Sequence, residues 1–316
     1  MTFSLRRTGL DPSQTLWTHS PADFGLVEVA GPDAGEFLHR LSSQDVAGMR
    51  SGNLRPAAFL NPKGKLLASG WIARLPDRFV IEVASRQVAD LAELLERYHF
   101  SEKLAISVRK DSHCAELVGD AGPAVAGVPL GTALVDSHGN VLLSTSWREL
   151  VWVRAHSTAT AALPWASSHA AALTDSKAEL LRIASGIPLA GVDTDASTLG
   201  PEAGIEPAFS LTKGCYTGQE IVARIATYGH VNRKLCLVEI AAAAAPAPGT
   251  PLCELEDGDP VGRTTSSAML PTGDRCLALA YLPRDFWAEG TQLALAAKSG
   301  SRVQVLDFGA AVASTT

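Results

Sequence analysis

The segment that constrains this chain most is Lys213-Gly214-Cys215-Tyr216-Thr217-Gly218-Gln219-Glu220. Its two glycines let the backbone come close to a ligand or to another segment of the chain. The spacing Thr217-x-x-Glu220 is that of a capping box, which predicts a helix that begins at about Gly218. Three apolar residues of this helix are expected to face inward: Ile221, Val222 and Ile225.

Cys215 is the candidate reactive group of this segment. It precedes the predicted helix N-terminus and lies two residues from Lys213. The helix dipole and the lysine cation both favour a thiolate, so we expect the pKa of Cys215 to be lowered. The structural alternative is a buried cysteine in a tight turn, because free cysteines are among the most buried residues.

Length and patterning predict three units. The chain has 316 residues, more than one ordinary hydrophobic core requires. We expect an α+β unit at 1–110, a second α+β unit carrying the motif at 111–233, and a C-terminal β-barrel at 234–316. In the first unit a strand and helix, further strands, and a helix and strand follow one another, which is the order of a split-βαβ, ferredoxin-like unit.

The second and third units are predicted from weaker patterns. The second repeats the strands, adds an Ala-rich helix at about 158–172, and opens a further helix with a capping box at Ser176-x-x-Glu179. The third has short strands at regular spacing, which is typical of a small barrel. Its expected strands are 235–240, 252–255, 276–281, 292–296 and 303–308.

Composition excludes several classes of protein. The net charge of −6 leaves no basic surplus to neutralise a phosphate backbone, so bulk nucleic-acid binding is not expected. The five cysteines are scattered, and none of the eight histidines stands at zinc-ligand spacing from them. We therefore expect reduced thiols, no disulfide framework and no self-contained metal site. Without a signal peptide or an apolar run of roughly 18–20 residues, we expect a soluble cytoplasmic protein with no membrane partner.

The motif resembles the signature of the YgfZ family, folate-binding proteins related to the glycine-cleavage T-protein and tied to iron–sulfur cluster maintenance. Four flanking segments agree with that family: Arg182 to Pro188, Pro201-Glu202, Val222-Ala223-Arg224 and Arg233-Lys234-Leu235. The resemblance runs from about residue 26 to residue 308 and is strongest over 180–235. It implies two ferredoxin-like units and a C-terminal barrel arranged as in T-protein relatives, which hold tetrahydrofolate in the central hole of a three-domain ring.

The resemblance also implies a set of site residues. Cys215 would be the reactive group, and tetrahydrofolate or a derivative the cofactor. Glu202 would accept hydrogen bonds from the pterin, and a cation would meet the glutamate tail. The implied folate residues are Arg182, Glu202, Lys213, Tyr216, Gln219, Glu220 and Arg224. For five of these a structural role is the alternative: a solvated acid at Glu202, an ion pair at Arg224, packing at Tyr216, and capping of the turn at Gln219 and Glu220.

Three positions argue against catalysis of aminomethyl transfer. Relatives with transferase activity carry an acidic pair at the positions of Ala68 and Ser69, and a pterin-contacting glutamate at that of Ala184. Alanine can neither take a proton nor bind a pterin ring. The leading hypothesis is thus a folate-binding accessory protein that serves iron–sulfur enzymes or assembly proteins. A folate-dependent aminomethyltransferase or demethylase and a non-catalytic interaction scaffold are the alternatives.

Overall fold

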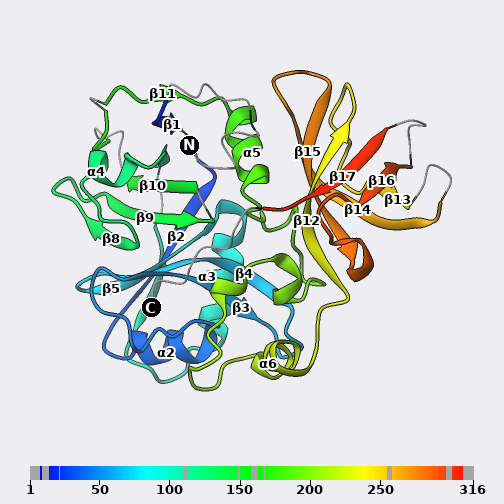
Figure 1. Cartoon of the computed structure of the whole chain (residues 1–316). Helices are drawn as coiled ribbons and strands as arrows, with labels where there is room; N and C mark the ends of the chain where they lie inside the picture. Colours follow the sequence, from blue (N-terminus) through cyan, green and yellow to red (C-terminus); the bar gives the residue numbers. More distant parts are fainter. Residues whose placement is uncertain are drawn as a thin grey trace.

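Three β-sheets organise the chain in a computed structural model (Figure 1). The structure describes residue 8 and residues 14–20, 22–109, 113–148, 150–157, 163–166, 168–254, 258–296 and 301–308. Two sheets are open and the third is a closed barrel, so the expected α+β class with a C-terminal barrel is confirmed. In the described part of the chain, no helix is long and apolar enough to cross a membrane.

The first sheet has the strand order β3-β4-β5-β2-β6 and is antiparallel throughout. Helices α2 and α3 pack on one of its faces, because inward residues recur at helical spacing in both. Alternation along β5 sends Phe79, Ile81 and Val83 to that helical side, and Val80 and Glu82 to the opposite face. Its elements are β2 (Phe24–Ala30), α2 (Ala34–Leu41), β3 (Leu54–Leu60), β4 (Leu66–Arg74), β5 (Arg78–Ala84), η1 (Ser85–Gln87), α3 (Val88–Arg97) and β6 (Ala105–Val108).

The second sheet, β11-β1-β7-β10-β9-β8, repeats this order with β1 in the place of β6. The N-terminal strand therefore joins the second sheet by pairing with β7, although it falls inside the unit predicted at 1–110. The two predicted boundaries between the three units, after residues 110 and 233, stay a prediction. The elements are β1 (Trp17–His19), β7 (His113–Val118), α4 (Gly122–Ala126), β8 (Thr132–Val135), β9 (Val141–Trp147), β10 (Leu150–Ser157), β11 (Ala171–Ala172) and α5 (Asp175–Ala184).

The faces of the two sheets that lack helices pack against each other. Leu26 and Val80 of the first sheet meet Val141 and Leu143 of the second in one buried cluster. Toward the barrel, Trp71 stands edge-on between two tryptophans of the second sheet, with ring centroids 6.4 Å from Trp147 and 6.1 Å from Trp152. These large side chains hold the sheets apart at that end, which leaves room for a cavity.

The barrel follows helix α6 (Gln219–Tyr228), and α5 packs against its wall. Ala184 is buried there among the barrel's leucines, so a longer side chain at this position has no space. Sequence patterning missed one strand, β14, because its Thr- and Ser-rich sequence reads as a loop. The strands are β12 (Arg233–Ala241), β13 (Pro251–Cys253), β14 (Pro260–Met269), β15 (Arg275–Pro283), β16 (Gln292–Leu295) and β17 (Arg302–Leu306), with η4 (Arg284–Phe286) after β15.

Three local predictions are wrong. The helix expected at 158–172 is absent from the described residues of that range, which form turns and strand β11; residues 158–162 and 167 lie outside the described part. Helix α5 is capped by Thr174, whose side chain accepts from the Lys177 N–H, and not by Ser176. Helix α6 begins where expected, but its N-cap is Gly218 at φ 79°, and no side chain caps it.

Candidate functional site

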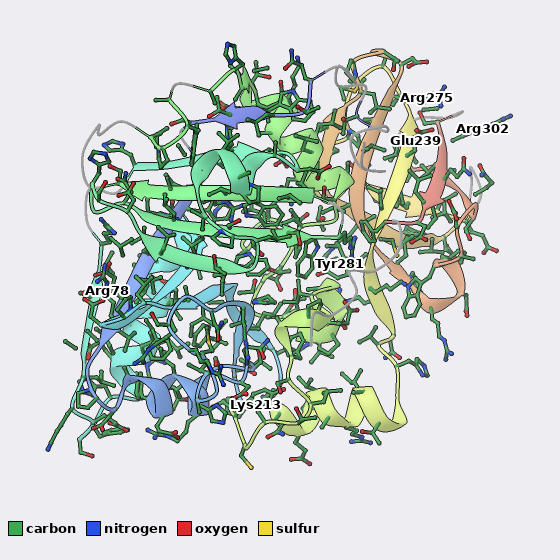
Figure 2. The ribbon with its side chains drawn as sticks, turned by 60° about the vertical axis from the view of Figure 1, so that its left-hand side comes forward. Arg78, Lys213, Glu239, Arg275, Tyr281 and Arg302 are labelled. Atoms are coloured by element: carbon green, nitrogen blue, oxygen red, sulfur yellow. The ribbon has the colours of Figure 1, made fainter. Side chains whose placement is uncertain are left out.

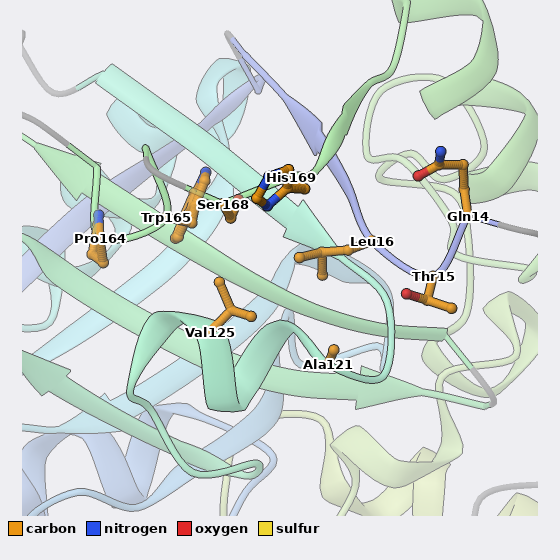
Figure 3. A pocket seen from close by; sticks show the side chains of 9 residues that line it. All are labelled: Gln14, Thr15, Leu16, Ala121, Val125, Pro164, Trp165, Ser168 and His169. Atoms are coloured by element: carbon orange, nitrogen blue, oxygen red, sulfur yellow. The ribbon is translucent and has the colours of Figure 1, made fainter.

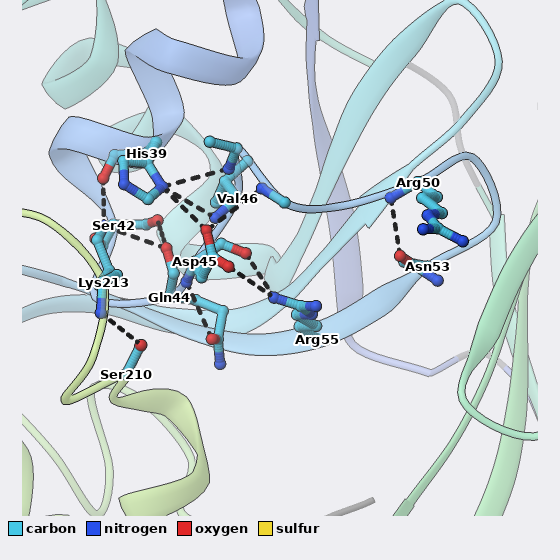
Figure 4. A network of polar contacts seen from close by, with 12 residues as sticks. His39, Ser42, Gln44, Asp45, Val46, Arg50, Asn53, Arg55, Ser210 and Lys213 are labelled. Atoms are coloured by element: carbon cyan, nitrogen blue, oxygen red, sulfur yellow. Dashed lines mark hydrogen bonds and ion pairs between the residues drawn. The ribbon is translucent and has the colours of Figure 1, made fainter. Parts of the chain in front are cut away.

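Lys213 ties the motif loop to the first sheet. Its ammonium donates to the backbone carbonyls of His39, Ser42 and Gln44, the last two at 2.7 and 3.1 Å (Figure 4). All three ammonium hydrogens therefore have acceptors, in the last turn of α2 and in the loop that follows it. Burial lowers the pKa of Lys213 to about 8, against the opposing charge of Asp45. This cation is bound to protein carbonyls, and as a folate contact it stays a prediction.

Tyr216 and Gly218 pack the same loop into the molecule. Tyr216 is buried in the central apolar cluster, and burial raises its pKa to about 12. No described residue forms a hydrogen bond with its hydroxyl. A Cβ at Gly218 would stand 2.5 Å from the Asn61 carbonyl oxygen, so the left-handed glycine lets α6 start directly against the 61–64 turn. Gln219 Oε1 accepts from the Tyr216 N–H at 3.3 Å, which links the first residue of α6 to the turn before it.

The rest of the motif faces solvent. Cys215, Glu220 and Arg224 are exposed, and Cys215 is a free thiol. The cation expected to favour its thiolate, Lys213, is bound to backbone carbonyls. Because the Cys215 side chain is exposed, its thiol can be reached from solution, as the hypothesis of a reactive thiol requires. The alternative of a buried cysteine is excluded.

Arg182 and Glu202 link units of the fold. Arg182 binds Glu179 and Asp193 at 2.7 Å each, and it donates to Ser266 of the barrel at 2.7 Å. Glu202 is buried and pairs with Arg233 at 3.2 Å. The Arg233 guanidinium lies 5.0 Å from the ring of Tyr281, which stands where the barrel meets the rest of the molecule (Figure 2). Both groups are thus committed to interdomain contacts, and as folate ligands they stay predictions.

Two adjoining hollows share part of their lining, and together we call them the central cavity. The inner chamber lies between the two facing sheets, and the outer chamber lies between the second sheet and α5. The inner chamber has a volume of about 80 Å³ and the outer chamber about 330 Å³. The chambers share Phe24, Trp152, Arg154 and Ile187. Trp71, Trp147 and Ser69 complete much of the inner wall, and Arg182 is the one predicted folate residue that lines either chamber. Cys215 lines neither chamber.

A chain of buried charges crosses the central cavity. Arg154 donates to Glu82 at 2.8 Å and to Glu116 at 3.2 Å, and its guanidinium stacks 3.5 Å from the centre of the Phe24 ring. His19 connects Glu116, at 3.2 Å, to the exposed Asp175, at 3.0 Å. Each charge thus has a partner, which is the condition for burying charges at all.

The network shifts the pKa values of its members. Burial opposes ionisation of Glu82, but the Arg154 charge and the His156 hydrogen bond lower its pKa to about 2. The hydrogen bond with Glu116 raises the pKa of His19 to about 9, although burial works against it. Burial, with the charge of Glu82 adding to it, raises the pKa of Cys114, the neighbour of His156, well above its ordinary value. Clusters of shifted groups beside a cavity mark candidate functional sites.

Sequence reasoning did not find this network. Its members come from β1, β5, β7 and β10, so no spacing rule groups them. One signal was present: Glu82 and Arg154 each interrupt an otherwise apolar strand, where a charge is rare unless it is paired.

A second hollow of about 460 Å³ lies on the outer side of the second sheet, next to α4 (Figure 3). Trp165 and Leu16 form its apolar floor, and the Trp165 indole donates to Thr18 at 3.2 Å. Its described lining holds no buried acid or arginine. Its lining residues are Gln14, Thr15, Leu16, Ala121, Val125, Pro164, Trp165, Ser168 and His169. The central cavity is therefore the better candidate for a specific ligand.

Comparisons with known proteins agree with this fold. Residues 233–306 match the family described as glycine cleavage T-protein C-terminal barrel domain. The crystal structure of glycine cleavage system aminomethyltransferase T from Bartonella henselae superposes with a TM-score of 0.81, covering 93% of this chain and 86% of that chain at 19% identity. At that identity the likeness shows the fold alone, which is the fold of the T-protein relatives.

Two curated relatives narrow the assignment. The chain is 30% identical to the tRNA-modifying protein YgfZ of Enterobacter sp. (strain 638) over 257 residues, which make up 77% of each protein. The chain belongs to the YgfZ family. It is also 25% identical to the iron-sulfur cluster assembly factor IBA57 homolog, mitochondrial, of Mycosarcoma maydis, over 75% of this chain and 59% of that protein. The chain thus spans less than two thirds of the fungal relative's length.

Proposed function

We propose that this protein binds a reduced folate in the central cavity and supports iron–sulfur enzymes or their assembly in the cytoplasm. Family membership supports the proposal, as does similarity to the fungal iron–sulfur cluster assembly factor. All five cysteines are free, which agrees with a reducing compartment. The observation that carries the folate part is the shape and lining of the cavity.

The lining fits a flat, partly polar ring. Ligand cavities have volumes of about 300–1,000 Å³ and apolar or aromatic walls with a few placed polar groups. The outer chamber, about 330 Å³, lies in that range, and tryptophans wall the inner one. The indole Nε1 of Trp147, an inner-wall residue, is buried and finds no acceptor in the described part of the chain. A ligand carbonyl would supply that acceptor.

The residues beside the folate would bind and orient it, and the folate itself supplies a carrier for a one-carbon unit. Glu82 lines the cavity but is already held by Arg154 and His156. Ser69, at a position where transferase relatives carry an acid, lines the cavity but has no carboxylate. The described lining of the inner chamber therefore lacks an uncommitted general base, which disfavours the aminomethyltransferase alternative.

The test is titration of the full chain with tetrahydrofolate, by calorimetry and by tryptophan fluorescence. Trp147→Phe keeps the packing and removes Nε1, so we expect binding to weaken about 2- to 10-fold, the value of one hydrogen bond. Trp287→Phe is the matched control, because its indole donates to Leu282 within the barrel. If millimolar tetrahydrofolate produces neither binding heat nor a shift of the thermal midpoint, the folate proposal fails and the interaction scaffold is favoured.

The thiol part has a separate test. Cys215 does not line the central cavity, so action on a folate bound there would require the motif loop to move. A mixed disulfide with a partner, or shared cluster ligation with a partner, needs only the exposure it has. Cys215→Ala should bind tetrahydrofolate as wild type does but fail to restore iron–sulfur enzyme activity in cells that lack the protein. Full restoration by this variant would remove the thiol from the function.

A further inference from the structure

Three potential metal ligands converge at the wall of the inner chamber. Glu82 from β5, Cys114 from β7 and His156 from β10 place ligand atoms within 4.8 Å of one another, and all three residues are buried. Glu82 Oε1 lies 2.7 Å from His156 Nε2, and Cys114 Sγ lies 3.8 Å from the same nitrogen. Among the described residues this is the one such group of three or more.

Hydrogen bonding alone leaves this cluster incomplete. One ring nitrogen carries either a hydrogen or a lone pair, so Glu82 and Cys114 compete for a single position on His156. The second ring nitrogen, Nδ1, is buried and has no hydrogen-bond partner among the residues that the structure describes. A buried imidazole with one contested and one unpaired nitrogen is costly. A cation between the three ligand atoms would use a lone pair from each.

We propose that Glu82, Cys114 and His156 bind a first-row divalent cation of borderline character, such as Zn²⁺ or Fe²⁺. One sulfur, one nitrogen and one oxygen suit these ions, whereas Mg²⁺ and Ca²⁺ prefer oxygen alone. The carboxylate and a thiolate match the two positive charges. Because Glu82 also lines the inner chamber, the fourth coordination position is available to water or to a cavity ligand.

The geometry requires small movements. Ligand atoms around a tetrahedral zinc lie roughly 3.3–3.6 Å apart, so the carboxylate oxygen, now 2.7 Å from Nε2, must move away from it by roughly 0.6 Å or more. Arg154 donates to the other oxygen of Glu82 at 2.8 Å and would orient the ligating carboxylate. The ligands come from three strands and are far apart in sequence, which is why cysteine and histidine spacing excluded a metal site.

Cobalt provides the test, because a thiolate bound to Co²⁺ gives a charge-transfer absorption band. We expect metal-free, reduced full-length protein to develop this band on saturation with one equivalent of Co²⁺, and Zn²⁺ to remove it. Cys114→Ser and His156→Gln should lose the band. Where Cys114→Ser does not fold, His156→Gln carries the test. Zn²⁺ should also raise the thermal midpoint of wild type but of neither variant.

Two controls separate this site from the other thiols. Cys236→Ser removes a sulfur that is buried in the barrel, and Cys215→Ser removes the exposed one. Both should keep the band. A band that survives Cys114→Ser, disappears in Cys215→Ser, or never forms in folded wild type overturns the proposal. The titration uses metal alone, so its outcome does not depend on folate binding.

Discussion

The motif loop and the central cavity are built on opposite principles. The loop is one continuous segment, Lys213 to Glu220, whose buried members hold units together while Cys215 stays exposed. The cavity is lined by residues from many strands, and its charges are buried and paired. The motif therefore identifies the family, but its Lys213 and Tyr216 side chains contact other parts of the protein and stabilise the fold.

This difference predicts where stability and where chemistry are lost on mutation. Changes in the charge network should destabilise the fold most, because each charge there depends on its neighbours. Changes in the buried part of the motif should cost less, and a change at the exposed thiol almost nothing. The four predictions below follow that order.

Arg154→Met should have the largest effect. It leaves Glu82 and Glu116 buried without their shared cation, and breaking a buried pair in this way costs about 3–5 kcal/mol. Urea unfolding of wild type and variant measures the difference. Arg275→Met is the control, because the Arg275–Glu239 pair lies on the exposed outside of the barrel, and it should change little. Equal effects of the two variants would remove the distinction between the regions.

Lys213→Met tests whether the motif lysine stabilises the fold. It leaves three carbonyl acceptors without their charged donor, and hydrogen bonds to charged groups contribute about 1.5–3 kcal/mol. We expect a loss in that range by urea unfolding. Lys65→Met is the matched control, since Lys65 donates to one carbonyl, of Ser197, at the surface. If Lys213→Met is as stable as its control and binds folate less well, the lysine belongs to the ligand site instead.

The predictable parts of the structure depended on local patterns. Phe37, Leu38, Leu91 and Leu95 recur at helical spacing and fixed both helices of the first unit, because the sheet buries that face. The motif and its flanks placed the chain in its family. The Ala-rich stretch at 158–172 misled, since helix propensity without an apolar face gives no packing partner.

The cavity network escaped prediction for a different reason. Glu116 is the cross-strand neighbour of both Arg154 and His19 in the second sheet, and Glu82 reaches Arg154 only because the first sheet packs against that face. The sequence of one chain does not state these strand and sheet pairings. For Cys215 the motif was recognised, but the exposure of its side chain could not be predicted from it. The same motif is equally compatible with a buried turn. The contacts of Lys213 could likewise not be predicted, because its acceptor carbonyls lie more than 160 residues away in the sequence.

His19 should make stability fall with rising pH. Its pKa rises from 6.5 to about 9 on folding, so the stabilisation is complete below pH 6.5 and is lost as the pH rises through 9. The thermal midpoint should therefore decline between pH 6.5 and 8, and His19→Gln should flatten the decline. Lys213, with its pKa lowered to about 8, has the opposite effect only at higher pH. A slope that is unchanged in His19→Gln would assign the decline to other groups.

Cys215→Ala should have the smallest effect on stability, within about 0.5 kcal/mol, because exposed side chains away from caps and cores contribute little. The same exposure predicts selective chemistry. In the native protein, iodoacetamide should alkylate Cys215 first, since the other four cysteines are at most 3% exposed. Mass spectrometry of the alkylated peptides measures the order. If Cys114 or a barrel cysteine reacts as fast, the fold opens often enough that burial no longer separates the motif thiol from the thiol beside the central cavity.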